Sequence, residues 1–450
     1  MSRRAYQSEI NLWIVASFIF FASLTENTGY TKPLELLAEI PEPFISLESQ
    51  KNTMILVEKS TQQLYLYEFD GNYRQILRIH CSTGKVAGNK REAGDRKTPE
   101  GIYFCTEEFT KKELAPIYGT RAFPIDYPNY IDRTAGRNGS AIWIHGTNKE
   151  LKRRDSNGCI ALNNEDIDLL SQYILLNRTP VILVNKMKYS HPEEIAEVKE
   201  AVAGFLDNWS LSFNAASIAD HLAYYDDSFS FDVTFWTDWV PVRDRLTALT
   251  GQFTVGMKNL SVYRHDGVFV ALFDQIAQTS EQAWLAGTRK LFLTRQGDRF
   301  KIIGDEFQTL PNKGHEEGAL QTHPLIAAST SLEKNLLIKE EIKSMIDEWL
   351  AAWISKDVER YGQYYSEGFR AMDMDRAGWL NYKRVLNRKY GFINVSIDNL
   401  SVSTDKNNQS TVTFVQTYQS SGLCDIGSKK LLLKREGGKW KILREIWKEK

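Results

Sequence analysis

The second half of the chain repeats itself at a constant offset of 140 residues. "FLDNWSLSFNAASIADHLAYYDDSF" (205–229) aligns with "MIDEWLAAWISKDVERYGQYYSEGF" (345–369) without a gap, and Trp209 falls on Trp349. Aligned aromatic residues at helical spacing are typical of a buried helix face. A fixed period of this length indicates a duplicated structural unit rather than a chance similarity.

The same register continues to the end of both copies. "NLSV" begins at Asn259 and again at Asn399, and each copy closes on strand-like segments joined by glycine turns. A helical start followed by strands predicts an α+β cone, in which helices pack on a curved sheet. We expect one cone at 195–310 and a second at 335–450, with the intervening residues as a linker.

Residues 50–187 have a different pattern, dominated by strands. "MILVEKSTQQLYLYEFDG" alternates and is rich in β-branched and aromatic residues, and Asp70-Gly71 is a hairpin signal. One clear helix is expected in "NNEDIDLLSQYIL", capped by Asn163 or Asn164. Strands in hairpin order predict a mainly β domain, a mixed or antiparallel sandwich.

The amino terminus has the pattern of an export signal. Arg3 and Arg4 precede a nearly apolar run from Leu12 to Leu24, which is short for a membrane span. We expect 1–28 to be a signal peptide or an uncleaved membrane anchor, although a buried amino-terminal helix is an alternative. Either form of export places the protein in the periplasm or cell envelope, and the uncleaved form would anchor it to the inner membrane.

Composition argues against several classes of partner. The net charge is −1, so there is no global electrostatic case for binding nucleic acid. The four cysteines form no C-x-x-C pair, and no H-E-x-x-H occurs, so no metal or cofactor is expected. A thiol kept free in an oxidising compartment is more often chemical than structural.

One cysteine and one histidine have the spacing of a reactive pair. Cys159 follows Gly158 in "RRDSNGCIALNNED", and His145 ends the strand pattern "SAIWIHGTN". An imidazole can take the thiol proton and return it to a leaving amine. Backbone N–H groups around Gly158 and Cys159 would face a developing oxyanion. The carbonyl of Gly146, or Ser156, would fix the histidine tautomer.

These residues resemble a known catalytic domain. "KTPEGIYF", "IHGT" and "SNGCIALNNED" occur in the order typical of the L,D-transpeptidase (YkuD-type) family, over residues 52–186. The resemblance implies a β-sandwich in which Cys159 is the nucleophile and His145 the base. The remaining motif positions are Gly146, Ser156 and Gly158.

Two positions depart from the family pattern. Asn157 stands where a histidine is common, and Ala161 replaces an arginine two residues after the cysteine. The repeated units resemble nuclear-transport-factor-2-like domains, also called SnoaL-like. A subgroup that joins one such domain to a "GCIAL" sequence includes L,D-carboxypeptidases that trim muropeptides and affect cell shape. This chain is similar to that subgroup but carries two such domains.

The resemblance implies a tetrapeptide stem of peptidoglycan as the substrate. Cys159 would form a thioester with the third residue and release the terminal D-alanine. An amine acceptor would then give a crosslink, and water would give a trimmed stem. Transpeptidation is the first prediction and carboxypeptidation the alternative, while a non-catalytic wall-binding module is the rival from another class.

Further residues are candidates for holding substrate or partners. Lys152, Arg153 and Arg154, just before the cysteine, could attract stem carboxylates, although a solvated loop face is the simpler interpretation. Tyr118 lies in a Pro- and Gly-rich insertion that could cover the site. The carboxy-terminal domains could bind the wall or pair two copies of the chain into a homodimer. The substrate-binding candidates are Thr98, Tyr118, Arg153, Arg154 and Asn157.

Overall fold

A computed structural model describes residues 39–47, 52–308, 323–405 and 409–449. The predicted signal or anchor at 1–28 lies outside these residues. Of the helices in the described ranges, none combines the length and the apolar character needed to cross a membrane.

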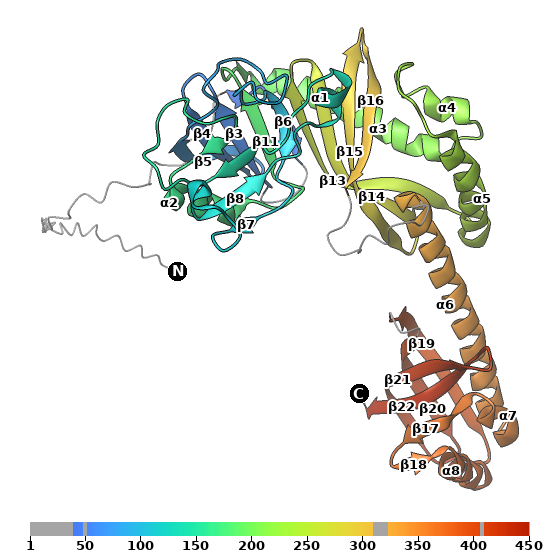
Figure 1. Ribbon diagram of the computed structural model, residues 1–450. Helices are drawn as coiled ribbons and strands as arrows, with labels where there is room; N and C mark the ends of the chain where they lie inside the picture. The colour runs from blue at the N-terminus through green and yellow to red at the C-terminus, as the bar shows by residue number, and fades with distance from the viewer. Residues whose placement is uncertain (1–38, 48–51, 309–322, 406–408, 450) are drawn as a thin grey trace, which may run out of the picture.

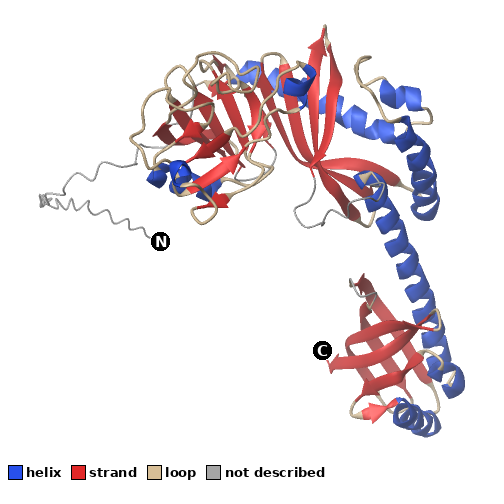
Figure 2. Ribbon diagram, viewed as in Figure 1, coloured by secondary structure: helices blue, strands red, loops and turns tan. Residues whose placement is uncertain are grey.

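The part of the chain that contains Cys159 is a sandwich of two sheets (Figure 2). The strands of the first sheet are β3 (Asn52–Glu58), β4 (Gln63–Phe69), β5 (Tyr73–His80), β6 (Gly101–Phe104) and β11 (Pro180–Val184). They run in the order β5-β4-β3-β11-β6, and β3 and β11 are parallel. The fold is therefore a mixed β-sandwich, as the hairpin order predicted.

The first sheet is buried on both of its faces. On β4, Leu64 and Leu66 enter the sandwich core, while Tyr65 and Tyr67 belong to a cluster shared with the first cone. Successive side chains of a strand point to opposite faces. Apolar residues at consecutive positions therefore record a sheet covered on both sides, which explains runs such as "MILV" and "PVILV".

The second sheet carries the reactive residues. Its strands are β7 (Phe109–Thr110), β8 (Arg121–Pro124), β9 (Trp143–His145) and β10 (Ile160–Ala161). They run in the order β10-β9-β8-β7, with β9 and β10 parallel. The short helices of this domain are η1 (Pro116–Tyr118), α1 (Tyr130–Thr134), α2 (Asn164–Leu170) and η2 (Ser171–Tyr173).

The first cone places helices against one face of a curved sheet (Figure 1). Its helices are α3 (Pro192–Leu211), η3 (Ser212–Asn214), α4 (Ile218–Leu222) and α5 (Val233–Thr250), and its strands are β13 (Phe253–His265), β14 (Val268–Thr279), β15 (Ala283–Gln296) and β16 (Arg299–Gln308). A fifth strand, β2 (Phe44–Leu47), pairs with β13 at the sheet edge. This strand precedes the sandwich in sequence, so the chain enters the first cone before it forms the sandwich. Two further strands, β1 (Ile40–Pro41) and β12 (Tyr189–Ser190), pair with each other beside it.

The second cone has a six-stranded sheet and shares a long helix with the first. Its helices are α6 (Pro324–Ile354), α7 (Val358–Gly362) and α8 (Arg376–Lys389), and its strands are β17 (Tyr365–Ala371), β18 (Met374–Asp375), β19 (Ile393–Thr404), β20 (Ser410–Ser420), β21 (Cys424–Glu436) and β22 (Lys439–Glu449). The first turns of α6 pack in the core of the first cone through Leu325 and Leu332, and its later turns enter the second core through Ile346 and Trp349. The expected linker therefore ends in helix.

The duplication is confirmed at the level of single bonds. Trp209 Nε1 donates to the Tyr225 hydroxyl at 3.2 Å, and Trp349 Nε1 donates to the Tyr365 hydroxyl at 3.0 Å. The "NLSV" repeat marks the same irregularity in both sheets. Asn259 and Asn399 adopt φ of 55° and 56°, and the strand register shifts beside each of them. Asparagine tolerates this left-handed conformation, which a β-bulge requires.

Candidate active site

The candidate nucleophile and base lie at the ends of two neighbouring parallel strands. His145 is the last residue of β9, and Cys159 directly precedes β10. The strands pair His145 with Ala161, and the His145 carbonyl accepts a hydrogen bond from Leu162 N at 2.9 Å. Both side chains line one cavity of about 270 Å³. The thirteen residues between them, 146–158, form the connection that brings the two strand ends together.

The imidazole of His145 is held in one orientation by its own backbone. Its ring is buried, and Nδ1 lies 2.6 Å from the Gly146 carbonyl oxygen. Because a carbonyl oxygen can only accept, Nδ1 carries the proton in this contact and Nε2 is left for the reaction. Burial lowers the pKa of His145, opposed by the hydrogen bond to Gly146. The ring is therefore neutral at neutral pH, the form that can act as a base.

The thiol of Cys159 is partly exposed and protonated at rest. Its Sγ lies 3.5 Å from the Ala141 carbonyl oxygen, to which the S–H donates. Burial raises the pKa of Cys159, while a backbone hydrogen bond from Trp143 and the positive charge of Lys90 lower it. A neutral thiol beside a neutral imidazole requires the proton to move as the bond to substrate forms.

The turn before the cysteine depends on glycine. Gly158 has φ of +133°, and a Cβ at this position would lie 2.9 Å from the Lys97 carbonyl oxygen. Ser156 braces the turn from within, since its hydroxyl donates to the Cys159 carbonyl at 2.6 Å and accepts from Gly158 N at 3.1 Å. Ser156 thus orders the backbone around the cysteine, whereas the sequence left it as an alternative partner for the imidazole.

Two of the predicted substrate-binding residues line the cavity. Asn157 and Tyr118 both belong to its wall. The Tyr118 ring meets the His145 ring edge-on, with 5.1 Å between their centroids. The Pro- and Gly-rich insertion therefore reaches the site, in the position expected of a cover.

The other three predicted residues point elsewhere. Arg153 donates to the Ser60 carbonyl and Arg154 to the Lys59 carbonyl, and neither lines the cavity. Thr98 is 1% exposed and forms its hydroxyl contacts within the protein. A direct substrate contact by any of the three would need these bonds to break, because each side chain is already bonded within the protein.

Of the lysines that line the cavity, Lys152 belongs to the basic cluster expected before the cysteine, whereas Lys85 and Lys149 were not predicted. They alternate with acidic residues, and their ion pairs are loose, such as Lys85 with Asp155 at 3.5 Å. Lys85 follows "CSTG" after a strand, a position with no charge cluster to mark it. The charged lining residues are Lys85, Lys149, Glu150, Lys152 and Asp155.

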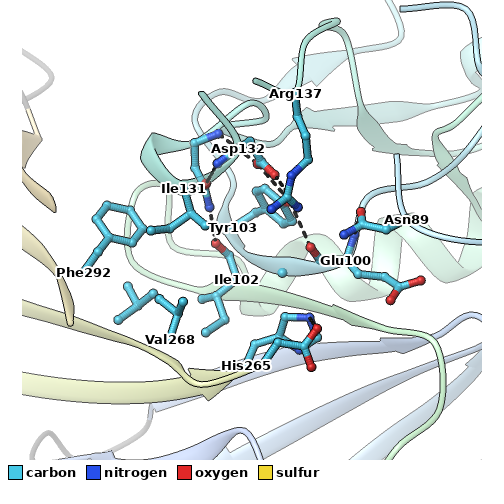
Figure 3. Close-up of a pocket in the computed structure, with 14 residues that line it drawn as sticks. Asn89, Glu100, Ile102, Tyr103, Ile131, Asp132, Arg137, His265, Val268 and Phe292 are labelled. Atoms are coloured by element: carbon cyan, nitrogen blue, oxygen red, sulfur yellow. Dashed lines mark hydrogen bonds and ion pairs between the residues drawn. The ribbon is translucent and has the colours of Figure 1, made fainter. Parts of the chain in front are cut away.

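A second cavity lies between the sandwich and the first cone (Figure 3). Its volume is about 150 Å³, with apolar walls that include Ile102 and Phe292 and a polar side formed by Asp132, Arg137 and His265. Arg137 pairs with the buried Asp132 at 3.3 Å. No cysteine lines this cavity, so the thiol chemistry belongs to the cavity around Cys159.

Comparison with known proteins gives two family matches. Residues 52–183 match the L,D-transpeptidase catalytic domain family (YkuD), and residues 341–446 match the Cds6 C-terminal NTF2-like domain. YafK of Escherichia coli (strain K12) and of Escherichia coli O157:H7, each named as a candidate L,D-transpeptidase, are 31% identical to this chain over 122 residues. These residues are 27% of this chain, which spans about half (46%) of the length of these curated relatives.

Solved structures of similar proteins include two from other bacteria. The helical cell shape determining protein Pgp2 from Campylobacter jejuni is 21% identical, with 59% of this chain and 95% of that chain covered and a TM-score of 0.45. Bd1075 of Bdellovibrio bacteriovorus is 20% identical, with 92% and 99% covered and a TM-score of 0.33. By these matches, the sandwich at residues 52–183 is similar to the L,D-transpeptidase catalytic domain family and residues 341–446 are similar to the NTF2-like family.

Proposed function

We propose that this protein is a cysteine L,D-transpeptidase that acts on the tetrapeptide stems of peptidoglycan. The observation that carries the proposal is the shared cavity, in which Cys159 is partly exposed and the Gly146 carbonyl directs His145 Nε2 away from the backbone. The cavity is lined by both lysines and acidic residues, which can pair with the carboxylate and the amine of a peptide. The stems are its proposed substrate because the family match covers the catalytic domain.

In the first half-reaction the thiol proton moves to His145 Nε2 as Sγ attacks the carbonyl carbon of the third stem residue. The oxygen of that carbonyl becomes an oxyanion, which backbone N–H groups of the turn at Gly158 and Cys159 would stabilise. The C–N bond to the terminal D-alanine then breaks, and the proton on His145 passes to the leaving amine. The product is a thioester on Cys159 and free D-alanine.

In the second half-reaction an acceptor attacks the thioester carbonyl. His145 takes the acceptor's proton, the C–S bond breaks and the thiol is restored. A stem amine as acceptor forms a crosslink, whereas water leaves a tripeptide. Carboxypeptidation is thus the second candidate for the same site, and Asn157 favours it through the loss of an imidazole that the family commonly has beside the cysteine.

This substrate makes the cell envelope the proposed place of action. Export would depend on residues 1–28, as signal peptide or as anchor. A homodimer through the carboxy-terminal domains is part of the same proposal, with the outer sheet face of the second cone as its site, because the first cone's sheet packs against the sandwich.

The proposal is tested by mass analysis of tetrapeptide muropeptides incubated with residues 30–450. New dimers linked between third residues, absent with Cys159→Ala, are the expected result. Tripeptide monomers without dimers would replace transpeptidation by carboxypeptidation. No conversion by the unaltered protein, with or without added amine acceptors, would overturn both.

A further inference from the structure

A buried lysine lies behind the nucleophile turn, on the side away from the cavity. Lys59 directly follows β3, and its side chain is 1% exposed. Its ammonium donates to the Gly88 carbonyl at 2.6 Å, to the Thr98 carbonyl at 2.7 Å and to Glu100 Oε1 at 2.9 Å. An ammonium has three protons, so this one is fully used. A charge this deeply buried is tolerated because it is paired and hydrogen-bonded, and these bonds fix the position of its partners.

The segment around Thr98, which Lys59 bonds, also supports the turn before Cys159. The Thr98 hydroxyl donates to the Gly158 carbonyl at 2.8 Å and accepts from Gly84 N at 2.9 Å. The neighbouring Lys97 carbonyl oxygen lies where a Cβ on Gly158 would clash, which shows how closely the two backbones approach. Any shift of Thr98 therefore moves the peptide group that joins Gly158 to Cys159.

The opposite flank of the turn is tied to the same lysine through its backbone. The Lys59 carbonyl accepts from Gln62 Nε2 at 2.7 Å, and Gln62 Oε1 accepts from the backbone N–H groups of Thr83 and Arg154, each at 3.0 Å. Thr83 in turn accepts from Ser156 N at 3.1 Å. Hydrogen bonds therefore connect Lys59 to Gly158 through Thr98, and to the segment before the turn through Gln62.

Glu100, the acidic partner of Lys59, lines a different cavity from Cys159. Glu100 lines the cavity between the sandwich and the first cone, where Figure 3 shows it beside Asn89. Its backbone N–H donates to Asn89 Oδ1 at 2.8 Å. Lys59 itself is absent from the residues that line the cavity around Cys159. It can act on the reaction only through the residues that it holds.

We propose that Lys59 is a positioning residue: through Thr98 it sets the Gly158–Cys159 peptide group at the geometry that receives the oxyanion. This inference deepens the proposed function, since it assumes that Cys159 attacks a carbonyl. It does not depend on the peptidoglycan stem as substrate. A small acyl donor is therefore enough to test it.

The test compares two reactions of Cys159 in the full chain. In acylation by p-nitrophenyl acetate the thiol sulfur attacks the ester carbonyl, its proton passes to His145, and the C–O bond breaks to release p-nitrophenolate through an oxyanion. Iodoacetamide alkylates the same sulfur by displacing iodide, with no oxyanion. Lys59→Met should lower the acylation rate constant about 10- to 100-fold, the range expected for a misplaced catalytic group. Alkylation should stay within about twofold.

Thr98 offers matched variants for the same measurement. Thr98→Val removes the hydroxyl at nearly constant volume and should reproduce the acylation loss, while Thr98→Ser should restore most of it. The double variant Lys59→Met with Thr98→Val should lose little more than either single one, because both act on one peptide group. Acylation at the unaltered rate in Lys59→Met would overturn the proposal. So would equal losses of acylation and alkylation, which indicate general disorder.

These outcomes are separable from those of the proposed function. A protein that leaves muropeptides unchanged but loses acylation selectively in Lys59→Met would retain the positioning role and lose its assigned substrate. A protein that converts muropeptides with Lys59→Met as fast as without it would retain the substrate and lose the positioning role.

Discussion

At the scale of single residues, the site pairs two neutral groups rather than an ion pair. The causes are burial of the thiol and burial of the imidazole, each of which disfavours the charged form. Lys90 and the Trp143 backbone work against this at the sulfur, and Gly146 works against it at the ring. The balance keeps His145 ready to accept a proton, which is what the first half-reaction requires.

The pH dependence of acylation follows from this balance. His145 must be unprotonated to act as base, and its pKa is lowered from the ordinary 6.5. The acid limb of kcat/KM should therefore fall below pH 6.5, since this limb reports the free enzyme. Rates of p-nitrophenyl acetate cleavage between pH 4 and pH 9 would measure this limb. Below the pKa of His145, kcat/KM should fall about tenfold for each pH unit. A limb well above 6.5 would contradict the burial argument.

How far the sequence predicts this site differs from residue to residue. Cys159 and His145 were predicted as a pair from their motifs, and the structure brings both to one cavity, because a strand end and a glycine turn are local features. The orientation of Arg153 and Arg154 was not predicted, because the sequence of a basic loop does not indicate which backbone carbonyls its side chains will bond. Thr98 was assigned to substrate from its motif, and the structure turns it toward the backbone of Gly158 instead.

At the scale of elements, α6 is one helix that serves two hydrophobic cores. Leu336 packs in the first cluster and Ile342 in the second, so the change of partner falls within two turns of helix. The exposed Glu340 lies between them and pairs with Lys343 at 2.9 Å on the surface. The helix therefore has to remain continuous for the second cone to fold on the end of the first.

A break in α6 should be costly in a way that loss of a surface charge is not. Glu340→Pro removes a helix hydrogen bond and clashes with the preceding turn, which costs about 3 kcal/mol. Glu340→Ala loses the ion pair alone, worth about 0.5 kcal/mol or less. Scanning calorimetry should show the unfolding of the carboxy-terminal region shifted to lower temperature in the proline variant alone. Equal melting of the two variants would mean that α6 is not needed as one rigid element.

At the scale of the whole molecule, the two copies of the cone have taken different roles. The outer face of the first sheet carries Tyr263, Leu272 and Phe292, which pack against the sandwich. Strand register places Thr413 of the second copy at the position of Leu272. At this position the second cone thus has a polar residue where the first has an apolar one that packs against the sandwich.

A lysine pair tests this divergence. Lys290 lies in the first interface with its side chain 6% exposed, and it pairs with Asp126 at 2.7 Å and with Glu306 at 3.2 Å. Its counterpart Lys430 is exposed. Lys290→Met should lower the free energy of unfolding by about 3 kcal/mol, because it removes the buried ammonium that pairs with the half-buried carboxylates of Asp126 and Glu306. Lys430→Met should change it by about 0.5 kcal/mol or less in the same urea titration. Similar losses for both variants would refute the assignment of this face.

The sequence by itself predicted the duplicated cones, the β-rich domain and the shared location of Cys159 and His145. Each of these follows from periodicity or short spacing, which depend on neighbours along the chain. The tertiary structure alone decided that β2 completes the first cone, that α6 joins two cores, and that Lys59 lies behind the cysteine turn. Lys59 and Thr98 are 39 residues apart in the chain, and the paired residues of β2 and β13 are more than 200 apart. Burial and hydrogen bonding select such partners only when the whole chain is folded, so no local pattern records them.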